Sequence, residues 1–118
     1  MKTFSHYLIL MVLFAVSILP RVLADTHYVS PAGSNTAPYT NWVTAANTIQ
    51  AAVSAASSND TVMVTNGTYN AGVVITDIRL ESVNGPEVTI AQKTSYGRCF
   101  FLQGSAVVSG FTVKDGDA

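Results

Sequence analysis

The sequence predicts an all-β solenoid, a right-handed parallel β-helix of about three coils that follows a capping amphipathic helix. Two observations predict it. Before Asp60, one segment repeats its apolar residues at helical steps. After Asp60, short apolar triplets alternate with turns, and the turn glycines Gly67, Gly85 and Gly104 recur at nearly equal intervals. Short strands at such a regular interval are typical of coils that stack and complete one another's core.

Residues 1–24 have the pattern of an export signal. Lys2 precedes an apolar run that covers residues 7–19 and is broken only by Ser17, and Ala24 suits a signal-peptidase site. The run is shorter than the roughly 20 residues that span a bilayer, which disfavours the alternative of an uncleaved anchor. We therefore expect a secreted or cell-envelope protein, with no membrane contact after cleavage.

Residues 25–118 suffice for one small domain, and their charges are sparse. Four Lys and Arg residues stand against seven Asp and Glu residues, a net charge of −3. Nucleic acid is an unsuitable partner for such a surface, because its phosphates attract clustered cations. Cys99 is the only cysteine, so an intrachain disulfide is excluded, and we interpret it as a small buried residue on a strand.

The N-terminal part, residues 25–60, should hold a strand, a loop and the capping helix. The strand is expected at residues 26–30, and prolines and glycine punctuate the loop behind it. Apolar residues at steps of three and four predict a helix over residues 42–56, with 49–56 as its most secure part and Trp42 in its buried stripe. Its N-cap is left open among three residues: Asn41, Thr44 and Thr48.

Residues 61–118 should form the first coils, with side chains alternating between the core and solvent. The inward set is expected to be Val62, Val64, Ile78, Leu80, Val88, Ile90, Phe111 and Val113. The outward set is expected to be Met63, Arg79, Thr89 and Thr112.

Four motifs resemble a known family. They are Tyr28-Val29-Ser30-Pro31-x-Gly33-Ser34-Asn35; Thr48-Ile49-Gln50-Ala51-Ala52-Val53; Asp60-Thr61-Val62-Met63-Val64 with Asn66-Gly67-Thr68-Tyr69; and Val108-Ser109-Gly110-Phe111-Thr112-Val113. Together they resemble the start of secreted right-handed parallel β-helix proteins of the pectate-lyase-like superfamily. The resemblance implies a polysaccharide as partner and a lyase or hydrolase activity for a full-length protein. It also implies Ca²⁺ as a cofactor of that full-length protein, and the residues themselves indicate no other cofactor.

No residue matches a catalytic motif of these families, so the catalytic residues stay unassigned. Asp115 and Asp117 are weak candidates for a metal site, since two carboxylates at short spacing can supply oxygen ligands to Ca²⁺; a solvated turn is the simpler interpretation. Arg79 and Lys93 are interpreted as solvated outer-face residues, and His27 as a structural or surface residue.

Two functions remain open at this point. The first is the N-terminal scaffold of an exported carbohydrate-active β-helix protein, a polysaccharide lyase or hydrolase, with the 118-residue chain itself inactive. The second is a non-catalytic, adhesin-like surface protein that binds glycans or partners. Because the sequence stops just after a strand and a turn at Asp115-Gly116, we expect it to be truncated.

Overall fold

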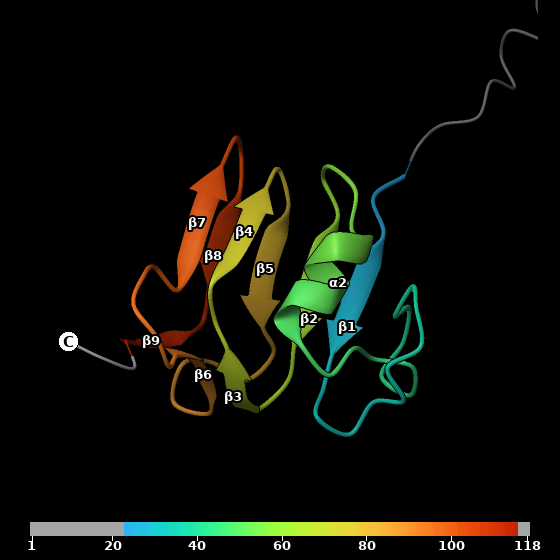
Figure 1. Ribbon diagram of the computed structural model, residues 1–118. Helices are drawn as coiled ribbons and strands as arrows, with labels where there is room; N and C mark the ends of the chain where they lie inside the picture. The colour runs from blue at the N-terminus through green and yellow to red at the C-terminus, as the bar shows by residue number, and fades with distance from the viewer. Residues whose placement is uncertain (1–22, 116–118) are drawn as a thin grey trace, which may run out of the picture.

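The computed structural model describes residues 23–115, so the predicted export signal lies outside the described residues except for Leu23 and Ala24. The described chain contains one helix and nine strands (Figure 1). In chain order they are β1 (Thr26–Val29), α2 (Ile49–Ala55), β2 (Thr61–Val64), β3 (Gly67–Asn70), β4 (Val73–Thr76), β5 (Arg79–Ser82), β6 (Thr89–Lys93), β7 (Phe100–Gln103), β8 (Val107–Ser109) and β9 (Thr112–Asp115).

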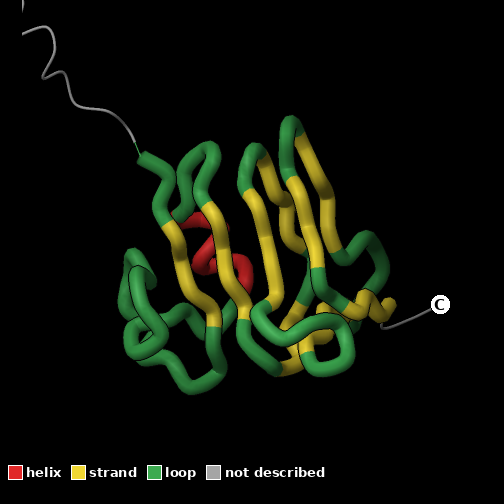
Figure 2. The backbone as a smooth tube through the Cα atoms, turned by 180° about the vertical axis from the view of Figure 1, so that it is seen from behind, coloured by secondary structure: helices red, strands yellow, loops and turns green. Residues whose placement is uncertain are grey.

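The strands form three separate sheets, and within each sheet every pair of neighbouring strands is parallel. From β2 onward each sheet takes every third strand: β2, β5 and β8 in the first, β3, β6 and β9 in the second, and β4 and β7 in the third. Strand β1 extends the first sheet beyond β2 (Figure 2). The predicted all-β class is thus confirmed, and its strands belong to parallel sheets.

The core lies between the sheets and is built from rows of residues that the strand register stacks on one another. One row runs from His27 through Val62 and Leu80 to Val108 across the first sheet. Val62 and Leu80 are fully buried, and Ile75 of the third sheet joins the same core cluster. The predicted inward positions on β2 and β5 are therefore confirmed.

Helix α2 is shorter than predicted. It begins at Ile49, with Thr48 as N-cap accepting a hydrogen bond from the Ala51 backbone N–H, and it packs against β1, β2 and β4 (Figure 1). Trp42 lies outside the helix, is 42% exposed and stacks edge-on against Tyr28, so its predicted place in the buried stripe is wrong. Within the described residues, no helix is long and apolar enough to cross a membrane.

The helix begins late because the backbone that precedes it forms hydrogen bonds with the edge of β1. Ala46 donates its N–H to the Tyr28 carbonyl and accepts from the Ser30 N–H, forming an isolated parallel bridge at Val29. An unpaired strand edge is a template for unwanted association. The segment that could have been a first helical turn instead covers this edge.

The predicted alternation fails on β6. Thr89 is fully buried and Val88 is 41% exposed, the reverse of the expectation, because β6 begins at Thr89 and places Ala91 opposite the buried Tyr69. A Val-Thr-Ile triplet suits either phase of a strand, and the partner strand decides between them. Val113, also expected inward, stands opposite Ala91 but is 53% exposed, since none of the described strands stacks on the outer side of β9.

The regular glycines do not mark equivalent positions either. Gly67 opens β3, Gly85 lies between β5 and β6, and Gly104 follows β7. The distance along the chain between paired strands also varies. Thr61 stands opposite Arg79, whereas Arg79 stands opposite the much more distant Val107.

Candidate functional site

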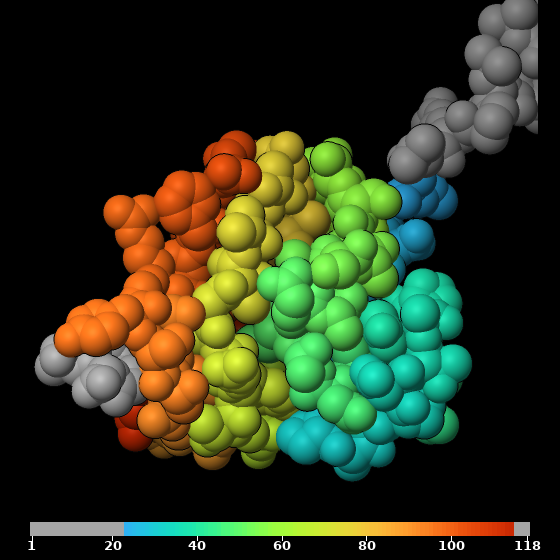
Figure 3. Space-filling model, viewed as in Figure 1, coloured from blue at the N-terminus to red at the C-terminus, as the bar shows by residue number. Residues whose placement is uncertain are grey.

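A surface hollow of about 350 Å³ lies between β4 and the segment that joins β6 to β7. In Figure 3 this segment, in orange, stands out at the left edge of the molecule. The hollow, called here the basic hollow, is lined by Gly72, Val73, Val74, Lys93, Tyr96, Gly97, Arg98 and Phe101. Its position follows from the pairing of β4 with β7, which brings two distant parts of the chain side by side.

Two glycines make room for the Lys93 side chain. A Cβ atom added at Gly72 would lie 2.9 Å from Lys93 Nζ, and one added at Gly97 would lie 3.0 Å from Lys93 Cε. Both glycines have φ values, +105° and +118°, that other residues rarely adopt. The end of the Lys93 side chain therefore lies close to the backbone of both glycines, and another residue at either position would be strained by its φ value.

Arg98 and Phe101 form the second wall. The Arg98 guanidinium carbon lies 5.4 Å from the centroid of the Phe101 ring, a cation–π arrangement that holds the charge over the ring. Phe101 stands opposite Val74 in the sheet, and both are about half exposed. Tyr96 is 81% exposed at the rim. The wall thus combines a fixed cation with apolar and aromatic surface.

The electrostatics of the basic hollow favour an anion. Its lining contains two cations, Lys93 and Arg98, and no Asp or Glu. Within the described residues, the ion pairs are His27–Asp60 and Arg79–Glu81, so neither cation of the hollow is paired with a carboxylate. A carboxylate or sulfate group on a ring-shaped ligand matches both features, since the ring can stack on Phe101 or Tyr96.

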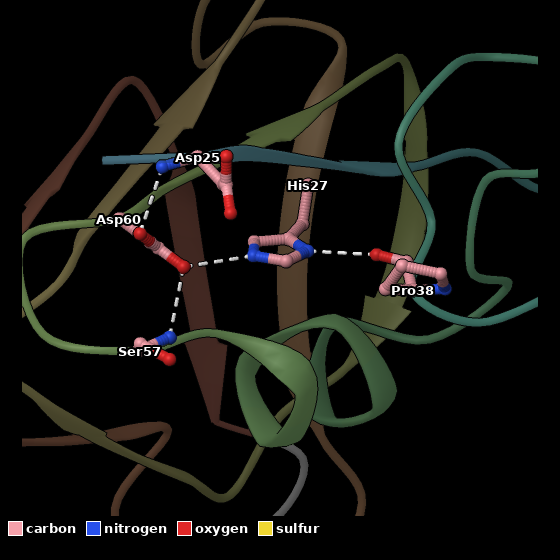
Figure 4. Close-up of polar contacts among 5 residues, drawn as sticks. All are labelled: Asp25, His27, Pro38, Ser57 and Asp60. Carbon is pink, nitrogen blue, oxygen red and sulfur yellow. Dashed lines mark hydrogen bonds and ion pairs between the residues drawn. The ribbon is translucent and has the colours of Figure 1, made fainter. Parts of the chain in front are cut away.

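A second constellation is buried at the start of the first sheet, and we call it the buried polar cluster (Figure 4). Asp60 accepts three hydrogen bonds: from the Asp25 backbone N–H at 2.8 Å, from the Ser57 backbone N–H at 2.8 Å, and from His27 Nε2 at 2.9 Å. His27 Nδ1 lies 2.7 Å from the Pro38 carbonyl oxygen. His27 and Asp60 are each 4% exposed.

The hydrogen-bond partners define the state of this cluster. The Pro38 carbonyl only accepts, so Nδ1 of His27 donates to it. Burial alone would raise the pKa of Asp60, but the backbone N–H groups of Asp25 and Ser57, together with His27, outweigh it and hold that pKa below its ordinary value of 3.8. Asp60 is therefore an ionised carboxylate at neutral pH, and its Oδ2 lies 2.9 Å from Nε2 of His27.

This pKa predicts a loss of stability in acid. Because folding lowers the pKa of Asp60, its contribution is fully present above the unfolded value and is lost as the pH falls through the folded value. Urea unfolding measured from pH 6 down to pH 2 should show stability falling below about pH 4. The Asp60→Asn variant should show a shallower fall; an equally steep fall in both proteins would contradict the assignment.

The residues singled out from the sequence are scattered. His27 is structural, as expected, but its partner Asp60 was not foreseen. Cys99 is buried just before β7 rather than within a strand, and its Sγ contacts the Lys114 carbonyl. Arg79 is exposed on β5 beside Glu81, as expected of a solvated residue, and Lys93, also interpreted so, lines the hollow.

The weak metal candidates are not assembled into a site. Asp115 ends β9, and Asp117 lies outside the described residues. Among residues 23–115, no group of three or more His, Cys, Asp or Glu side chains is placed to hold a metal ion.

Arg98, Tyr96 and Phe101 were not foreseen from the sequence as members of a site. The available signal was the stretch Ser95-Tyr96-Gly97-Arg98, an exposed aromatic and a cation around a glycine between two strands. Taken together, the parallel sheets and the basic hollow define a parallel β protein with an anion-attracting surface site. Comparison with protein-family models, curated proteins and solved structures finds no match.

Proposed function

We propose that this chain forms the scaffold of an exported, carbohydrate-active right-handed parallel β-helix protein, and that the basic hollow binds an acidic polysaccharide. The pairing of every third strand supports the β-helix, since a chain that returns to the same sheet after each three strands winds as a coil. The right hand is the one that parallel crossover connections adopt almost without exception.

The proposal of an acidic polysaccharide as the ligand rests on one observation, that positive charge and aromatic surface occur together in the basic hollow. Lys93 and Arg98 supply two cations to the lining, and Phe101 and Tyr96 supply aromatic surface beside them. A uronate residue has a carboxylate for the cations and a ring for the aromatic faces. A neutral polysaccharide would use only the second of these, so it should bind more weakly.

The test is binding of the purified chain to polygalacturonate, with dextran as the neutral comparison. The Lys93→Glu/Arg98→Glu variant should lose at least about tenfold in affinity by calorimetry, because hydrogen bonds to charged groups contribute about 1.5–3 kcal/mol each. Raising the salt concentration should weaken the binding, because these cations are partly exposed.

The matched control is Arg79→Glu/Lys114→Glu, which changes the net charge equally at exposed positions outside the hollow. An equal loss in both variants would reduce the interaction to general charge and refute a defined site. Equal affinity for dextran would refute the acidic class. Monitoring the absorbance of unsaturated products during incubation tests the expectation that this chain is itself inactive: product formation would overturn that expectation and indicate a lyase.

A further inference from the structure

We infer that Asp60 receives the new N-terminus that processing creates: cleavage after Ala24 turns the Asp25 backbone nitrogen into an ammonium that pairs with the Asp60 carboxylate. The inference rests on the export that is part of the proposed function. It adds a structural consequence to the cleavage that the sequence predicts after Ala24.

The Asp25 nitrogen is already in place for this pairing. It lies 2.8 Å from Asp60 Oδ1, while Ser57 N and His27 Nε2 both contact the other oxygen, Oδ2. Oδ1 therefore has one hydrogen-bond donor from the protein in this cluster, and that donor is the nitrogen which cleavage would release. Figure 4 shows the two backbone donors approaching Asp60 from different sides.

Residue 25 is also held from its other end. Its carbonyl accepts a hydrogen bond from the Thr61 N–H at 2.9 Å, the first rung of the ladder that pairs β1 with β2. The position of the nitrogen thus follows from the sheet and does not depend on the residues that precede it. Leu23 is 76% exposed and Ala24 is also exposed, so the bond before Asp25 lies open to a peptidase.

The chemistry of cleavage is hydrolysis by one water molecule. Its hydroxyl joins the carbonyl carbon of Ala24, the C–N bond breaks, and a proton goes to the nitrogen of Asp25. The released amine has an ordinary pKa of about 7.7–8.0, so it takes up a further proton at neutral pH. An amide donor to Asp60 becomes a charged donor, and charge-assisted hydrogen bonds are roughly twice as strong as neutral ones.

Three titratable side chains of the described residues lie near the new ammonium. Asp60 faces it from the segment before β2, His27 lies beyond Asp60 on β1, and the exposed carboxylate of Asp25 is on the same residue. The two carboxylates favour the protonated amine, and the imidazole of His27 meets the far oxygen of Asp60. Folding should therefore raise the pKa of this amine.

The experiment compares two purified chains, one that begins at Asp25 and one that retains Ala24, each released from a fusion without added residues. At about pH 6, the chain that begins at Asp25 should have an unfolding equilibrium constant about tenfold smaller, because its charged donor binds the Asp60 carboxylate more strongly than the amide N–H does. The raised pKa makes this advantage complete below the unfolded value, and it should disappear by about pH 10. Equal stability of the two chains at pH 6 would overturn the inference.

Two controls separate the ion pair from other effects. In the Asp60→Asn background, which keeps one acceptor oxygen, the two chains should differ little; a tenfold difference that persists there would overturn the role of Asp60. Acetylation of the Asp25 amine should abolish the advantage, and an advantage that survives acetylation would contradict the ion pair.

Processing is tested separately. Mass spectrometry of the exported protein should find a chain that begins at Asp25, and a different first residue would refute the processing site. The polysaccharide-binding test concerns the basic hollow and does not use the N-terminus. A failure of ligand binding therefore leaves the stability comparison intact, and a failure of the stability comparison leaves the binding site intact.

Discussion

Replacing Asp60 with alanine is expected to lower the free energy of unfolding by about 3–5 kcal/mol. The substitution removes the acceptor of three hydrogen bonds and leaves His27 Nε2 in the interior without its partner. The backbone N–H groups of Asp25 and Ser57 lose the same acceptor. An unpaired buried donor costs the full loss of its hydration, which exceeds the value of an average hydrogen bond.

Urea denaturation at pH 7 measures this effect. Glu87→Ala is the matched control, because it removes an exposed carboxylate from the connection between β5 and β6 and should change stability by about 0.5 kcal/mol or less. A loss below about 1 kcal/mol for Asp60→Ala would show that water or a rearranged loop replaces the carboxylate. Domains of this size are stable by only about 5–15 kcal/mol, so the expected loss is a large share of the total.

Leu80→Ala should cost about 2–5 kcal/mol. Leu80 is fully buried between Val62 and Val108 in a row of the first sheet. Parallel neighbours are held about 4.8 Å apart by their backbone hydrogen bonds, so the strands cannot close the space that the lost methyl groups leave. The cavity term therefore adds to the lost transfer free energy.

The comparison for this prediction is the same side-chain deletion at an exposed position. Leu102 on β7 is 49% exposed, so Leu102→Ala should cost markedly less in the same urea experiment. Similar losses at both positions would mean that the core between the sheets is not close-packed around Leu80.

Local pattern alone predicted much of this fold. The strands after Asp60 overlap the apolar triplets except for β3, which begins at Gly67, a residue expected in a turn. The residues of β2 and β5 face as their alternation indicates. The helix was found, and Thr48 is the one of the three N-cap candidates that the structure uses, so the helix begins at Ile49 rather than near Trp42. Alternation and helical period are properties of neighbours in sequence, and for that reason they can be read without the structure.

The errors arise where a distant partner decides. Which side chains of β6 face the core depends on Tyr69, which stands opposite Ala91. The backbone of Ala46 pairs with the edge of β1, so the helix cannot include this residue. The same limit applies to the sites. His27 and Asp60 lie far apart in the sequence and meet because β1 pairs with β2. Arg98 lies in the loop before β7, and no sequence period predicts how that loop brings it over Phe101 on β7.

The unequal spacing of paired strands has a consequence for protein engineering. The chain takes a much longer path to return from β5 to β8 than from β2 to β5, yet both pairs stack in one continuous register. The frame therefore accepts connections of different length without a shift of its strands. Residues 94–99, between β6 and β7, form one wall of the basic hollow, so libraries of longer or shorter segments grafted there should vary ligand preference on an unchanged scaffold.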